Sequence, residues 1–99
     1  MKKYTVVVDE DLQDLIPDYI NRQKSEISSI QDHLNKNDFP SLGRLAHDWQ
    51  GTGAGYGVPF ISEIGKKLGI AVKEEKEDVI LDLANQLETY LEQLEIIYE

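Results

Sequence analysis

One histidine, His47, lies among small and polar residues whose spacing is typical of one helix face. Its neighbours three and four positions away are Gly43, Arg44, Gln50 and Gly51. On a helical wheel at about 100° per residue, the apolar residues of this segment occupy an arc of roughly 120°, and His47 lies about 140° from its centre. We therefore expect His47 to face solvent from a helix, with little bulk around its ring.

This cluster has the residue types needed to accept a phosphoryl group. An exposed imidazole is largely neutral at cellular pH, and the neutral ring can attack phosphorus if the oxygens of the phosphoryl group find donors or cations. Gln50 could donate an amide N–H, and Arg44 could add positive charge. No other residue is evidently placed to act as a base. The alternative is that His47 is an ordinary surface histidine, as we interpret His33.

The two glycines beside His47 also have two interpretations. Glycine in a helix interior costs about 1 kcal/mol relative to alanine. Small residues around the ring would let the backbone or active-site loop of another protein approach it closely. The alternative is that Gly51 frays the end of the helix and that Gly43 is a neutral surface position.

The elements that must position this cluster are predicted to be helices throughout. Apolar residues at three-and-four spacing, with Gln23 filling one gap, predict a helix over 16–34. Asp38 is expected to cap the helix that carries His47, and Pro40 to lie in its first turn. The remaining expectations are a helix over 39–50, a glycine-rich connection over 51–57, a shorter helix from Pro59 to Leu68, a connection over 69–75, and a long last helix over 79–97.

The N-terminus is expected to be a short lead-in to these helices. Residues 1–8 are predicted to be extended, with Val6, Val7 and Val8 covering one end of the core. Asp9 or Asp11 could cap a short helical segment, after which Pro17 either kinks a helix or begins the next one. No stretch shows sustained strand alternation. The sequence predicts one all-α domain over 1–99, an antiparallel four-helix bundle with an extended and helical N-terminal lead-in.

Charge and composition limit the partners. The net charge of −9 disfavours nucleic acid and anionic lipid and favours a basic protein face, although the acids could serve solubility alone. No apolar run approaches the roughly 20 residues of a membrane span, and the N-terminus does not resemble a secretory signal. With no cysteine, and two histidines among scattered carboxylates, we expect no metal site. The 51–57 run lacks the context of a nucleotide-binding loop. A cytoplasmic location fits these observations.

The segment from Leu45 to Gly57, Leu-Ala-His-Asp-Trp-Gln-Gly-Thr-Gly-Ala-Gly-Tyr-Gly, resembles the signature of histidine-containing phosphotransfer (HPt) domains. That signature is roughly Ala-His-x-Leu-Lys-Gly followed by Ser or Thr, then small residues, an aromatic or apolar residue, and glycine. The resemblance continues upstream through Leu15-Ile16-Pro17 and downstream from Ile61 to Leu68, so that it covers nearly the whole chain.

The resemblance implies a phosphorelay intermediate. His47 would accept a phosphoryl group from the aspartate of one receiver domain and pass it to another. Gly51 would clear space beside the ring, and Gly53 would be a close-packing position between helices. Response-regulator receivers are the implied partners, with a hybrid histidine kinase as a further candidate. The chain would need no cofactor of its own, because the receiver supplies Mg²⁺, and it would be a monomer.

Two departures from the signature bear on activity. Gln50 stands where the family usually has lysine, so the positive charge is lost while a hydrogen-bond donor remains. A charged hydrogen bond stabilises by about 1–2 kcal/mol more than a neutral one, so transfer would slow about tenfold without stopping. Trp49 stands where leucine is usual, and we expect it to alter packing only. The chain is thus predicted to be a phosphocarrier rather than an autonomous kinase, since it has no ATP-binding segment. The predicted docking surface is Arg44, Asp48, Gln50, Gly51 and Ala54.

Two other functions stay open from the sequence. The substitution at Gln50 favours a module that docks a receiver without exchanging phosphate. The third possibility is a structural or adaptor helical bundle in which His47 has no role.

Overall fold

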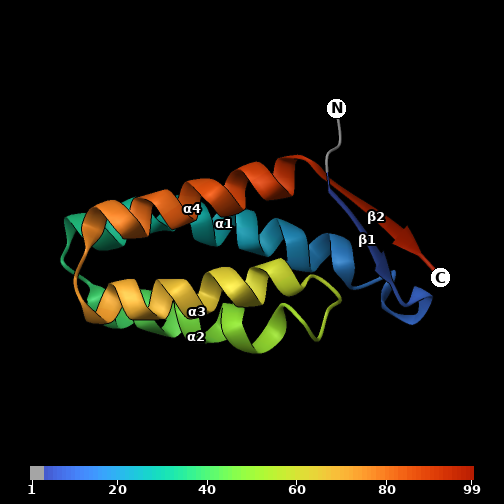
Figure 1. Ribbon diagram of the computed structural model, residues 1–99, viewed down its shortest axis with the longest axis horizontal. Helices are drawn as coiled ribbons and strands as arrows, with labels where there is room; N and C mark the ends of the chain where they lie inside the picture. The colour runs from blue at the N-terminus through green and yellow to red at the C-terminus, as the bar shows by residue number, and fades with distance from the viewer. Residues whose placement is uncertain (1–3) are drawn as a thin grey trace.

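The computed structural model describes residues 4–99, which form four α-helices and a two-stranded sheet (Figure 1). The order of elements is β1 (Tyr4–Val8), a 3₁₀ helix (Glu10–Leu12), α1 (Ile16–Asn35), α2 (Phe39–Thr52), α3 (Pro59–Lys73), α4 (Glu77–Glu92) and β2 (Leu94–Tyr98). The four helices lie alongside one another, and the sheet lies at one end of them (Figure 1). All four helices contribute side chains to one hydrophobic core. None of the helices in 4–99 is both long enough and apolar enough to span a membrane.

Helix α1 follows the predicted apolar pattern closely. It begins at Ile16 with Pro17 in its first turn, where the missing backbone N–H costs little, so Pro17 begins the helix rather than kinking it. Its buried side chains recur every three or four residues: Ile16, Tyr19, Gln23, Ile27, Ile30 and Leu34. The one polar member of this row, Gln23, is only 1% exposed.

Helix α2 is capped by Asp38, as predicted. One carboxylate oxygen of Asp38 accepts from the backbone N–H of Ser41 at 3.1 Å, and the other accepts from the Ser41 hydroxyl at 2.6 Å. The ring of His33 lies 3.5 Å from the second oxygen. These contacts satisfy a backbone donor of the first turn and place the start of α2 directly after the turn at 36–38.

Asp38 should make the stability of the protein depend on pH. The two hydrogen bonds from Ser41, first the hydroxyl and then the backbone N–H, hold the pKa of Asp38 below its usual value. A lowered pKa in the folded state contributes stability above the unfolded pKa of about 3.9, and that stability is lost as pH falls through the folded pKa. The melting temperature of wild type should exceed that of Asp38→Asn at about pH 6, and the difference should shrink below about pH 4. A difference independent of pH would contradict this account.

The predicted connection over 69–75 is wrong, because α3 continues to Lys73. Ala71 and Val72 are buried and extend the apolar row of the helix, and their burial offsets the cost of Gly69 within it. The turn to α4 falls instead at Glu74 to Lys76, where Glu75 adopts a positive φ of 51°.

The prediction of helix to residue 97, and with it the absence of strands, is also wrong. Helix α4 ends at Glu92, and Leu94–Tyr98 form β2, which pairs in parallel with β1. Tyr4 lies opposite Leu94 and Val8 opposite Tyr98. The extended lead-in is confirmed at positions 4–8, whereas positions 1–3 lie outside the described residues. Val8 is 1% exposed and covers the core, but Val7 is 56% exposed on the outer face of the sheet.

Candidate functional site

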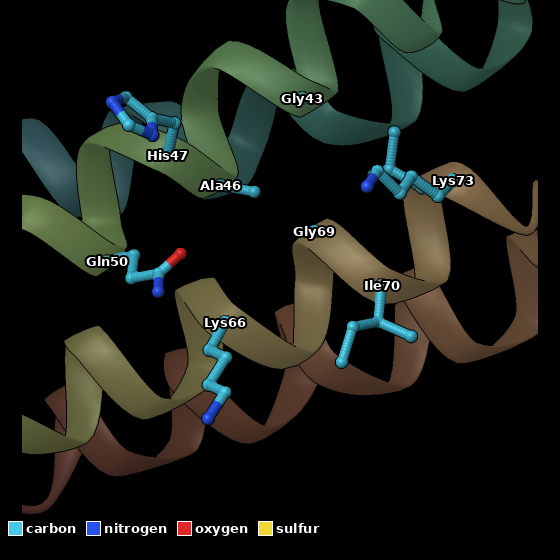
Figure 2. Close-up of a pocket in the computed structure, with 9 residues that line it drawn as sticks. Gly43, Ala46, His47, Gln50, Lys66, Gly69, Ile70 and Lys73 are labelled. Atoms are coloured by element: carbon cyan, nitrogen blue, oxygen red, sulfur yellow. The ribbon is translucent and has the colours of Figure 1, made fainter.

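His47 lies on the exposed side of α2, as predicted (Figure 2). The buried residues of α2 are Leu42, Leu45, Ala46 and Trp49, which pack into the core on the opposite side of the helix. The ring of His47 is therefore open to a molecule approaching from solvent.

Helices α2 and α3 approach each other closely at two glycines. A Cβ atom on Gly53 would lie 2.5 Å from the backbone nitrogen of Ser62, which confirms that Gly53 is a close-packing position. A Cβ atom on Gly65 would lie 2.5 Å from the backbone nitrogen of Gln50 and 2.8 Å from the carbonyl oxygen of Ala46. No side chain larger than hydrogen fits there without moving the helices, because the neighbouring atoms belong to backbone. Gly65 was not predicted from the sequence to be a close-packing position.

A groove of about 440 Å³ runs between α2 and α3 beside His47 (Figure 2). Helix α2 lines it with Gly43, Ala46, His47 and Gln50. Helix α3 lines it with Lys66, Gly69, Ile70, Val72 and Lys73. Each set recurs at three-and-four spacing, so two helix faces meet along the groove. The structure thus brings Gln50 together with His47, and adds two lysines that the sequence analysis did not assign to the site.

The four other predicted site residues do not line this groove. Two of them line a different hollow, and two are exposed near the C-terminal end of α2. Arg44 and Asp48 line a separate hollow beside α1, and the Arg44 guanidinium donates to the hydroxyl of Ser41 at 3.0 Å. Gly51 is exposed, and a Cβ atom there would have nothing within 4 Å. Ala54 is exposed, and its backbone N–H donates to the Ser62 hydroxyl at 2.8 Å. Arg44 is therefore not a lining residue of the groove that contains Gln50.

A buried hydrogen-bond network joins the core-facing side of α2 to α1. The indole N–H of Trp49 donates to the side-chain oxygen of Gln23 at 2.7 Å, and the Gln23 amide donates to the carbonyl of Tyr19 at 3.0 Å. The expectation that Trp49 alters packing only is therefore incomplete, because Trp49 also joins α2 to α1 through a polar contact. A fully satisfied buried pair of this kind favours one orientation of the two helices.

A second set of hydrogen bonds joins the C-terminal end of α2 to α1. The Thr52 hydroxyl donates to the carbonyl of Asp48 at 2.8 Å and lies 2.8 Å from the hydroxyl of Tyr19, which must then donate to it. Burial raises the pKa of Tyr19, so its hydroxyl keeps the proton that this bond needs. The Tyr19 ring stacks on Tyr56 with centroids 4.2 Å apart. These contacts restrain the position of α2, the helix that carries His47, relative to α1.

In the described part of the chain, no group of three or more His, Cys, Asp or Glu side chains could hold a metal ion. The His33 ring contacts Asp38, the cap of α2, and so has a structural environment.

No protein-family model matches the chain, and no curated protein or solved structure shows significant similarity to it.

Proposed function

We propose that this protein is a phosphorelay intermediate that accepts a phosphoryl group on His47 from a receiver-domain aspartate and passes it to another receiver. The observation that carries the proposal is the exposed imidazole on α2, open to solvent beside a groove that also contains Gln50. The resemblance of the segment from Leu45 to Gly57 to the HPt signature supports the same function.

We also propose that the four helices form an antiparallel bundle. Gly53 approaches Ser62, Gly65 approaches Gln50, and Gly43 approaches Val72. The contacts therefore run in opposite order along α2 and α3, which supports an antiparallel arrangement of that pair. Such a bundle gives His47 a rigid base from which a receiver can be met.

This chain is proposed to contribute a nucleophile and a hydrogen-bond donor to the transfer reaction. A ring nitrogen of His47 supplies the nucleophile, and the Gln50 amide donates to an oxygen of the phosphoryl group. The receiver brings the Mg²⁺ that neutralises charge on the phosphoryl group, so the chain is proposed to have no cofactor of its own. Exposed Gly51 leaves room for the receiver's loop next to the ring. The carrier is proposed to act as a cytoplasmic monomer, with a hybrid histidine kinase as a further candidate partner.

The test is phosphoryl transfer from a panel of phosphorylated receiver domains to wild type and to His47→Ala. Wild type should become labelled with phosphate that is labile in acid and stable in alkali, and His47→Ala should stay unlabelled. The matched control is His33→Ala, which should still be labelled. Equal labelling of wild type and His47→Ala would contradict the proposal.

A docking module without transfer is the second candidate, because Gln50 replaces the lysine of the HPt signature. Receiver binding that survives in His47→Ala, together with no labelling of wild type by active receivers, would favour this candidate. No receiver binding at all would leave an adaptor bundle.

A further inference from the structure

Among the four helices of the described chain, only α3, which faces His47 across the groove, has a net positive charge. Helix α3, Pro59–Lys73, contains three lysines and one glutamate, whereas α4, Glu77–Glu92, contains five acids and no lysine or arginine. Two of the α3 lysines, Lys66 and Lys73, line the groove beside His47. A locally basic groove in a chain of net charge −9 indicates a site for an anion.

Close packing at Gly65 sets the position of Lys66 along the groove. Because Gly65 lies against the backbone of Ala46 and Gln50, the next residue, Lys66, is at the same level as His47. Gln50 lies between His47 and Lys66 in Figure 2. Lys73 lies farther along the groove, near the level at which Val72 approaches Gly43.

From this geometry we infer that Lys66 supplies the positive charge for the phosphoryl group on His47 that α2 itself lacks. The inference rests on the proposed function. The Lys66 side chain is exposed and points away from Gln50 and His47 in Figure 2, but exposed side chains change rotamer within nanoseconds. Its flexible stem lets the ammonium group turn towards a phosphoryl group bound beside Gln50. Arg44 is not equivalent, because it lines a different hollow and binds Ser41.

Lys66 would act on the transfer step itself. The lone pair of a ring nitrogen of His47 forms the bond to phosphorus. The bond from phosphorus to the aspartyl oxygen of the receiver breaks, and its electron pair stays on the carboxylate. The proton on the other ring nitrogen is released to water. Throughout this step the oxygens of the phosphoryl group carry negative charge, which Lys66 stabilises from the α3 side of the groove.

The first test compares transfer from a phosphorylated receiver to wild type, Lys66→Gln and Lys67→Gln. Lys67 is the matched control, because it is the adjacent exposed lysine of α3 and does not line the groove. Transfer to Lys66→Gln should be about tenfold slower than to wild type, and Lys67→Gln should be unchanged. Adding Gln50→Lys to Lys66→Gln should restore the rate, since it returns a cation to the same groove. Equal rates for Lys66→Gln and Lys67→Gln would overturn the inference.

The second test needs no receiver. His47 is phosphorylated with phosphoramidate, the signal absent from His47→Ala is assigned to it, and its ³¹P shift is titrated. A nearby ammonium group lowers the second pKa of a phosphoryl group, so this pKa should be lower in wild type than in Lys66→Gln. The same pKa in both proteins would overturn the inference. No transfer by wild type, together with a pKa that depends on Lys66, would count against the proposed function and support the contact between Lys66 and the phosphoryl group.

Discussion

Gly65→Ala is expected to destabilise the protein by about 3 kcal/mol, the upper part of the range for overpacking a close contact. The added methyl group would lie 2.5 Å from the backbone nitrogen of Gln50 and 2.8 Å from the carbonyl oxygen of Ala46. Backbone atoms cannot turn aside as a flexible side chain can, so α2 and α3 must separate. Urea unfolding followed by circular dichroism measures the loss as a lower midpoint.

Gly43→Ala provides the matched control for this prediction. Gly43 is also a helix glycine at the contact between α2 and α3, but a Cβ atom there would only meet a methyl group of Val72 at an ordinary 4.0 Å. Alanine should therefore stabilise the helix at this position by up to about 1 kcal/mol. Similar midpoints for the two variants would show that α2 and α3 do not approach as closely at Gly65 as the structure has them.

The helices that carry local signals could be predicted from the sequence. The row from Ile16 to Leu34 repeats at the helical period, and Asp38 precedes the next apolar row by the spacing of a cap. Each signal lies within one element, so a single periodic pattern is enough to detect it. The exposure of His47 was predictable for the same reason, because it depends only on the position of His47 on its own helix.

The sheet could not be predicted in this way, because its two strands lie at opposite ends of the described chain. Leu94 continues the apolar row of α4, so a helical pattern accommodates it as well as a strand does. The residues that flank Val8 and Tyr98 in the sequence do not indicate that these two positions pair. The decisive contact is non-local, and local periodicity carries no information about it.

The groove was missed for a related reason. Lys66 and His47 belong to different helices, and only the close approach at Gly65 brings them to one level. In the sequence, Gly65 is one glycine within a predicted helix. Its contacts are all with α2, so they cannot be recognised until the two helices are placed against each other. Arg44 shows the opposite error, since helical spacing puts it near His47 although its side chain turns to Ser41.

Gly51→Gln is expected to slow phosphoryl transfer to His47 on the order of 100-fold, because it displaces the attacking and leaving groups from a close, aligned approach. Residues 47 and 51 are one turn apart on α2, so a long side chain at 51 lies beside the imidazole. The fold should tolerate the change, since nothing lies within 4 Å of a Cβ atom at this position. Circular dichroism should show unchanged helicity, while the rate of transfer from a phosphorylated receiver falls.

Gly51→Ala separates the size of the side chain from the loss of glycine itself. Alanine adds a single methyl group, so the transfer rate should stay near that of wild type, while the stability of the last turn of α2 rises slightly. If glutamine slows transfer and alanine does not, the glycine is needed for the space that a receiver's loop occupies. If glutamine transfers as fast as wild type, nothing approaches this side of His47, and Gly51 belongs only to the end of the helix.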